Sequence, residues 1–140
     1  MDAGGPSEGC HVEVRFESTA SAVALARNWF ARECRRAGVP ADAISRGLLP
    51  VSEIMSNAVR YGHTPVIRIE MDLTDEVFVA VHDDCSDPPD AGLEPLLDAS
   101  GGRGLLLASM LADDLGWTRT ATGKAVWFRL VTRKAPRRLA

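Results

Sequence analysis

The order of alternating and helical segments constrains the fold of this chain more than any single residue does. Five segments alternate apolar and polar residues, which is the pattern of strands with one buried face: residues 11–17, 67–73, 77–81, 115–121 and 124–131. Three segments show helical periodicity: residues 19–37, 41–61 and 105–113. After the first, the strands follow one another in pairs joined by short turns, and the helices stand apart from them. We therefore predict an α+β fold, a two-layer sandwich whose mixed or antiparallel sheet is covered on one face by helices.

The length and composition indicate one soluble domain. A chain of 140 residues suits a single core, and 46% hydrophobic with 25% charged residues is an ordinary balance for a soluble protein. We expect a disordered N-terminus over residues 1–10, the folded domain over residues 11–131 and a basic, flexible tail over residues 132–140. The irregular stretch over residues 84–102 is long for so small a domain, which is typical of a functional or mobile loop.

Charge, hydropathy and cysteine usage argue against several classes of protein. The net charge of -3 gives no broad electrostatic reason to bind nucleic acid or an anionic membrane. No apolar run approaches the roughly 20 residues that span a bilayer, and the N-terminus lacks the pattern of a secretory signal. Cys10, Cys34 and Cys85 are scattered and form no CxxC pair, which predicts reduced thiols in a cytoplasmic protein.

Glu53 and Asn57 are the first candidate site residues. They lie four positions apart, about one helical turn, so their side chains project from one face of the helix predicted over residues 41–61. That face points away from the apolar stripe, which consists of Ile44, Leu48, Val51, Met55 and Ala58. A carboxylate can take up a proton, and a carboxamide oxygen can ligate a hard cation such as Mg²⁺. Taken alone, the pair is equally compatible with a solvated helix face.

Two later motifs follow this pair along the chain. Asp83 ends a predicted strand, and the glycine-rich segment Gly101-Gly102-Arg103-Gly104 comes directly before a predicted helix. Glycines at the start of a helix let backbone N–H groups approach an anion. An aspartate at a strand end can also simply cap a turn, and glycines can simply join a loop to a helix. Lys124 is a candidate phosphate contact, although hairpin turns often carry a lysine.

Four segments in this order resemble the ATP-binding domain of the histidine-kinase-like ATPase superfamily, and in particular the small actinobacterial anti-sigma-factor serine/threonine kinases. The segments are Ser52-Glu53-Ile54-Met55-Ser56-Asn57-Ala58-Val59-Arg60, Val81-His82-Asp83-Asp84, Gly102-Arg103-Gly104-Leu105 and Gly123-Lys124-Ala125-Val126-Trp127. Each motif is weak alone, but the four together, with these gaps, are fairly specific. The resemblance covers roughly residues 11–131 and implies a Bergerat-type ATP-binding fold.

The resemblance also implies a role for each motif. Glu53 would be the general base that polarises the attacking hydroxyl group, and Asn57 would ligate the Mg²⁺ that bridges the phosphates of ATP. Asp83 would accept a hydrogen bond from the adenine amino group. The residues implied at the nucleotide, with Lys124 added as a further candidate, are Asn57, Asp83, Gly102, Arg103, Gly104, Leu105 and Lys124. Residues 85–101 would form a flexible lid.

The acidic turn departs from the pattern of the family. It usually reads Asp-x-Gly-x-Gly, but Cys85 and Asp87 occupy the two glycine positions in this chain. This difference bears on the affinity for adenine and on the geometry of the lid.

Two functions are therefore kept open. The first is a protein serine/threonine kinase that binds a sigma factor and phosphorylates an anti-sigma-factor antagonist. The second is a non-catalytic nucleotide-binding or degenerate module that acts by sequestering a partner protein. Relatives pair through the first strand and helix, so the resemblance implies a homodimer.

Overall fold

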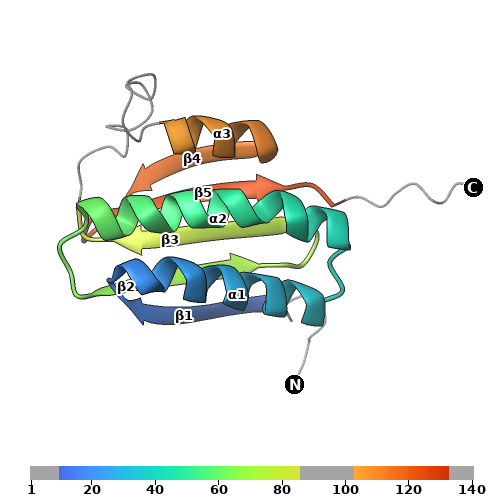
Figure 1. The fold of residues 1–140 in the computed structure, drawn as a ribbon, viewed down its shortest axis with the longest axis horizontal. Helices are drawn as coiled ribbons and strands as arrows, with labels where there is room; N and C mark the ends of the chain where they lie inside the picture. Colours follow the sequence, from blue (N-terminus) through green and yellow to red (C-terminus); the bar gives the residue numbers. More distant parts are fainter. Residues whose placement is uncertain (1–9, 86–102, 133–140) are drawn as a thin grey trace, which may run out of the picture.

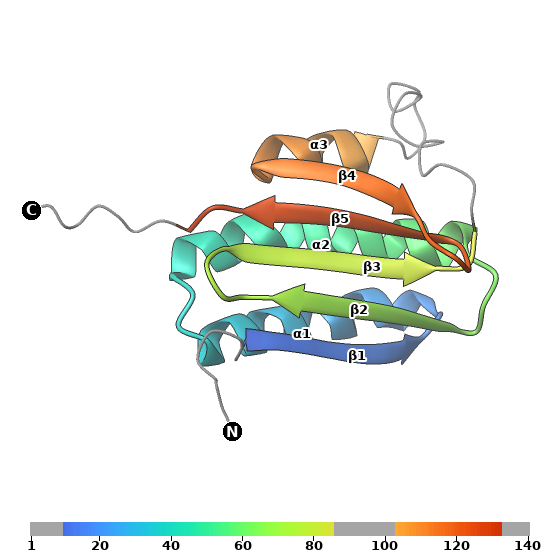
Figure 2. The ribbon, with the colours of Figure 1, turned by 180° about the vertical axis from the view of Figure 1, so that it is seen from behind.

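The computed structural model describes residues 10–85 and 103–132, which form one sheet covered by helices. The strands are β1 (His11–Glu17), β2 (Val66–Asp72), β3 (Val77–Asp83), β4 (Asp114–Arg119) and β5 (Lys124–Leu130). The helices are α1 (Ala20–Arg36), α2 (Ala41–Tyr61) and α3 (Arg103–Leu111). All three helices lie on one face of the sheet (Figure 1), and the view from behind shows the other face uncovered (Figure 2).

The sheet has the strand order β1-β2-β3-β5-β4, and every neighbouring pair is antiparallel. The predicted α+β class and the helix-covered sheet are thus confirmed. Of the two predicted sheet types, mixed and antiparallel, the sheet is antiparallel. Because β5 lies between β3 and β4, the two C-terminal strands continue the sheet beyond the β2–β3 hairpin. This order places the end of β3 beside the start of β5.

Most elements begin or end one or two residues from the predicted bounds, and for α3 and β4 the hydrogen bonds show why. Helix α3 starts at Arg103 rather than Leu105 and ends at Leu111 rather than Asp113. The backbone N–H of Asp113 already donates to the carbonyl of Arg129 at 2.9 Å, so the chain has joined the sheet at that residue. Strand β4 accordingly begins at Asp114 and ends at Arg119, because Thr120 N–H donates to Gly123 O at 2.9 Å and closes the hairpin turn.

The hydrophobic core lies between the helices and the inward face of the sheet. The predicted alternation is confirmed in the β2–β3 hairpin, where the predicted inward residues Ile67, Ile69, Met71, Leu73, Val77, Val79 and Val81 are all buried. Ala80, on the opposite face, is buried as well. Phe30 of α1 meets Phe128 of β5 with ring centroids 6.5 Å apart, and both side chains are fully buried. This contact joins the helix layer to the centre of the sheet.

Helix α2 lies in the middle of the helix layer and packs against α1, α3, β3 and β5. Its predicted apolar stripe is buried or half-buried, but its buried surface is wider than that stripe, since Ile54 is also fully buried. Asn57, on the side expected to point away from the stripe, is only 7% exposed. Helix α3 packs beside α2, on a side where an isolated helix would face water.

We predict that Phe128→Ala lowers the free energy of unfolding by about 3–5 kcal/mol, because it deletes a fully buried ring at the centre of the core. Phe78→Ala is the matched control. Phe78 lies half-buried on the uncovered face, beside Trp127 at a centroid distance of 6.0 Å, and its loss should be clearly smaller. Urea denaturation of the two variants measures both values. Equal losses would contradict the assignment of the core to the helix-covered face.

Candidate functional site

The carboxylate of Glu53 lies against the first turn of α3. A Cβ atom built on Gly104 would overlap Glu53 Oε1 and lie 2.5 Å from Glu53 Cδ. Only a residue without a side chain leaves room for the carboxylate in this position. The N-terminus of a helix has unpaired backbone N–H groups and favours negative charge. Two motifs that are some 50 residues apart in the sequence are therefore in contact.

Burial is the main influence on the acidity of Glu53. It raises the pKa of the carboxyl group above its ordinary value, and the positive charge of Arg60 is a smaller effect that lowers this pKa. Arg60 is exposed near the end of α2, with its guanidinium group 5.8 Å from the ring centroid of Tyr61. The sequence analysis gave Arg60 no role. The sequence feature that could have indicated a role is that Arg60 lies three residues after Asn57, which places both side chains on one face of the helix.

The side-chain oxygen of Asn57 is buried without a hydrogen-bond partner among the described residues. Leaving such a group unpaired costs roughly 1–3 kcal/mol, so an orphaned amide oxygen in a folded protein calls for an explanation. A carboxamide oxygen is a ligand suited to Mg²⁺. The position of this oxygen, one turn after Glu53, fits the predicted metal ligand.

Asp83, Cys85 and Lys124 form a closed polar cluster at the end of β3. The Lys124 ammonium group donates to Asp83 Oδ1 at 3.2 Å and to the Cys85 carbonyl at 3.3 Å, and Cys85 N–H donates to Asp83 Oδ1 at 2.7 Å. Asp83 Oδ2 lies 3.1 Å from Lys124 Nζ, within ion-pair distance but without the angles of a hydrogen bond. We treat this contact as an ion pair, since charge attraction does not require those angles.

Lys124 is 1% exposed and paired with Asp83, so it is not a solvated turn residue. Its inward position follows from strand alternation, because Val126 and Phe128, at two and four residues further along β5, are also buried. The sequence could have indicated this burial, because Lys124 lies two and four residues before the apolar Val126 and Phe128 in the same strand. Its contact with Asp83 follows from the β3–β5 register, in which the two residues are directly paired.

The side chain of Asp84 connects the end of β3 to the chain that follows α2 through hydrogen bonds. Its Oδ1 accepts the backbone N–H groups of His63 at 2.6 Å and Thr64 at 3.0 Å. The bond from His63 is the largest cause of the lowered pKa of Asp84. A Cβ atom on Gly62 would lie 3.3 Å from Asp83 Cβ, so the end of α2 is in contact with the candidate base-reading residue. The helix that carries Asn57 therefore ends against Asp83.

The remaining predicted residues are placed less completely. Leu105 is buried in the hydrophobic core, where its side chain packs with the apolar residues of α2 and the sheet. Arg103 begins α3, but its side chain lies outside the described part of the chain, as do Gly102, Asp87 and the lid predicted over residues 85–101 beyond Cys85.

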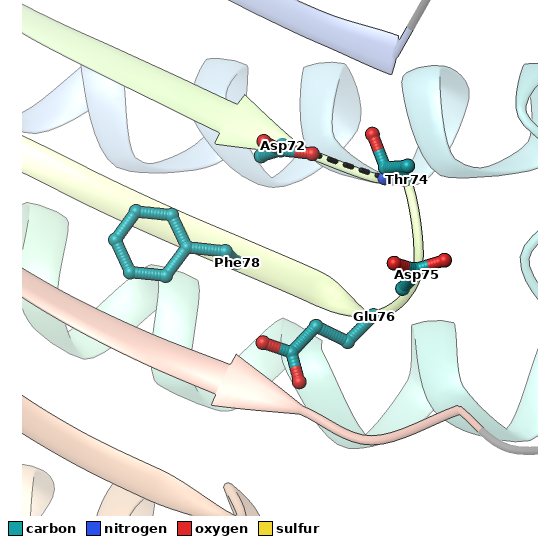
Figure 3. Close-up of a pocket in the computed structure, with 5 residues that line it drawn as sticks. All are labelled: Asp72, Thr74, Asp75, Glu76 and Phe78. Carbon is teal, nitrogen blue, oxygen red and sulfur yellow. Dashed lines mark hydrogen bonds between the residues drawn. The ribbon is translucent and has the colours of Figure 1, made fainter. Parts of the chain in front are cut away.

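Two further cavities lie away from Glu53 and Asn57. One of about 640 Å³ is at the β2–β3 turn and is lined by Asp72, Thr74, Asp75, Glu76 and Phe78 (Figure 3). The other, of about 620 Å³, lies at the opposite end of the same strands, and its lining includes Arg15, Arg68, His82 and Asp84. Neither cavity combines the carboxylate, amide and glycine found between α2 and α3.

A family model described as the histidine kinase-like ATPase domain matches residues 16–130. The chain belongs to the histidine kinase-like ATPase domain family. The match includes Glu53, Asn57, Asp83, Gly104 and Lys124, so the predicted family resemblance is confirmed. A search of curated proteins found no match.

Among solved structures, this histidine kinase-like ATPase domain is similar to the RsbU and RsbW domains of Rv1364c from Mycobacterium tuberculosis. The TM-score is 0.65 with 18% sequence identity, over 86% of this chain and 31% of that chain. The likeness establishes a common fold, and the chain spans about a third of the length of the protein it matches. Within residues 10–85 and 103–132, no helix is both long and apolar enough to cross a membrane.

We predict that Asn57→Leu stabilises the protein in the absence of divalent metal by about 1 kcal/mol, because it removes a buried oxygen that has no partner among the described residues. Asn28→Leu, on the exposed face of α1, is the matched control and should not stabilise the fold. Thermal unfolding in EDTA compares the two variants with the wild type. A destabilisation of Asn57→Leu by more than about 1 kcal/mol would show that the amide is held by structural hydrogen bonds.

Proposed function

We propose that this domain binds ATP with Mg²⁺ and acts as a serine/threonine protein kinase in the cytoplasm. The observation that carries the proposal is the contact between the half-buried Glu53 carboxylate and Gly104, with the orphaned oxygen of Asn57 one turn further along α2. Membership in the histidine kinase-like ATPase family supports ATP as the nucleotide. The resemblance to small anti-sigma-factor kinases supports a substrate that is an anti-sigma-factor antagonist and a second partner that is a sigma factor.

The residues present fit the cofactor and the nucleotide. Asn57 Oδ1 would ligate Mg²⁺, and Asp83 Oδ2, which is buried without a hydrogen-bond donor among the described residues, would accept the adenine amino group. Bound Mg²⁺ supplies charge neutralisation for the transferred phosphoryl group. Gly104 lies at the start of α3, where a helix N-terminus favours an anion, and in this structure the space it leaves holds the Glu53 carboxylate.

Glu53 would receive the proton of the serine or threonine hydroxyl group that attacks ATP. Burial raises the pKa of this carboxyl group, which brings it closer to neutral pH and makes it a stronger base than an exposed glutamate. Arg60 opposes that shift through its positive charge, which keeps Glu53 ionised and able to accept a proton. The backbone contact with Gly104 fixes the carboxylate in place before the substrate arrives.

We predict that Glu53→Gln lowers phosphoryl transfer about 10²–10⁴-fold, because an amide of the same shape cannot accept the proton. ATP binding should be retained. The measurement is transfer of labelled γ-phosphate to a candidate antagonist protein, with Glu17→Gln on the exposed side of β1 as control. Transfer by Glu53→Gln at the wild-type rate would remove Glu53 from the role of general base.

Cys85 favours the alternative of a non-catalytic module. It stands where the family usually has glycine, and hydrogen bonds hold both its amide and its carbonyl group. Thermal unfolding with Mg-ATP separates the two functions, since ligand at 100 times its dissociation constant adds about 2.7 kcal/mol of stability. No shift at millimolar Mg-ATP would leave partner sequestration as the function, and a shift without phosphoryl transfer would indicate a nucleotide-binding regulator.

The edge strand β1 supports a homodimer. It lies at the end of the sheet, and its outward residues alternate in charge as His11, Glu13, Arg15 and Glu17. If two copies pair antiparallel about Val14, each Glu13 faces Arg15 of the second copy and each His11 faces Glu17. The same register sets Val12 opposite Phe16 on the helix-covered face. Opposite charges and apolar pairs directly across a ladder are both stabilising.

A charge-swap series tests this dimer. We predict that Arg15→Glu weakens self-association several-fold, because it places two carboxylates opposite each other at two symmetric positions. The double variant Glu13→Arg with Arg15→Glu restores the pairing and should associate as the wild type does. Sedimentation equilibrium measures the dissociation constants. Equal association of the single and double variants would contradict pairing through β1.

A further inference from the structure

We infer that Lys124 is a positioning residue that sets the base specificity of the site by holding the Asp83 carboxylate. This inference rests on the proposed function, since it concerns the same nucleotide site. It gives Lys124 a role through Asp83 and assigns it no contact with phosphate.

The arrangement of donors leaves one acceptor open on Asp83. Oδ1 is occupied by Cys85 N–H at 2.7 Å and by the Lys124 ammonium group at 3.2 Å. Oδ2 has no hydrogen-bond donor among the described residues, although Lys124 Nζ lies 3.1 Å away. Two of the three ammonium protons are committed to Asp83 Oδ1 and to the Cys85 carbonyl. The lysine therefore fixes the rotation of the carboxylate, with Oδ2 as the oxygen that lacks a hydrogen-bond donor among the described residues.

The burial of the pair makes this arrangement rigid. The side chains of Lys124 and Asp83 are each 1% exposed, and a buried charge is tolerated only when it is paired and hydrogen-bonded. Neither side chain can turn toward water without breaking the ion pair. Without Lys124, the Asp83 carboxyl group would be buried without a cation and would lose the contact that fixes its rotation.

The hairpin between β4 and β5 delivers the lysine to this position. A Cβ atom on Gly123 would overlap the backbone carbonyl oxygen of Asp83 and crowd the backbone of Asp84. Only glycine lets the turn approach the end of β3 so closely. Gly123 and Lys124 thus act together. The glycine allows the hairpin to approach Asp83, and the lysine makes the contact with its carboxylate.

The contact between Lys124 and Asp83 affects which purine the site accepts. An ionised carboxylate only accepts hydrogen bonds, so it binds the 6-amino group of adenine and repels the 6-oxo group of inosine. A site built to hydrogen-bond a particular group discriminates strongly against an analogue that lacks it. Discrimination between ATP and ITP therefore reports on the charge and orientation of Asp83, independently of how well the phosphates are held.

The test is isothermal titration of the full chain with Mg-ATP and with Mg-ITP. We expect the wild type to bind ATP at least about tenfold more tightly than ITP, the value of one good hydrogen bond to a charged group. Lys124→Met should reduce this ratio to within about threefold. Arg119→Met is the matched control, because Arg119 is the exposed cation opposite Lys124 in the β4–β5 register and should leave the ratio unchanged.

A second variant covers the case in which Lys124→Met does not fold. Gly123→Ala keeps the lysine but pushes the hairpin away from Asp83, so it should also reduce the ratio. If either folded variant loses affinity for ATP and ITP by the same factor, or loses none, the lysine serves stability only and the inference is wrong. If the wild type binds neither nucleotide, the proposed function itself fails. If the wild type discriminates and both variants retain the discrimination, only the inference fails.

Discussion

The packing of α2 between two helices and against the sheet is the constraint on which the site depends. An amphipathic helix at the edge of such a layer would expose Glu53 and Asn57 to water, where an unpaired amide carries no penalty. With α3 alongside, the same residues lie at a buried seam between helices. Burial raises the proton affinity of Glu53 and leaves the oxygen of Asn57 without a partner among the described residues. The apolar packing that stabilises the fold thus also prepares the polar groups for a ligand.

Between α2 and α3, the polar groups proposed for function lower the stability of the folded chain. A buried amide oxygen without a partner and a desolvated carboxylate both lower the stability of the folded chain. Natural proteins retain such groups where activity requires them. The Asp83–Lys124 pair is different, because each charge there neutralises the other. The candidate site therefore combines polar groups without a partner among the described residues with a charge pair that fixes the orientation of Asp83.

Much of this architecture could be predicted from periodicity. Alternation located the β2–β3 hairpin, and the bounds of α2 at Ala41 and Tyr61 follow from its apolar stripe and from Gly62. The contact of Glu53 with Gly104 could be expected from the resemblance to a known family. Local patterns describe one element at a time, however, so they did not show that Asn57 would be buried. The β3–β5 register that sets Lys124 on Asp83 is likewise a property of the assembled sheet.

The insertion of β5 between β3 and β4 has a consequence for how the protein folds. The β2–β3 and β4–β5 hairpins are local, but the pairing of Asp83 with Lys124 joins residues 41 positions apart. Loop-closure entropy delays such long-range pairing relative to local hairpins. An intermediate that contains only α2, β2 and β3 would carry Glu53, Asn57 and Asp83 yet lack the partner that orients Asp83. The orientation of Asp83 by Lys124 therefore depends on this long-range pairing and is expected to form later than the local hairpins.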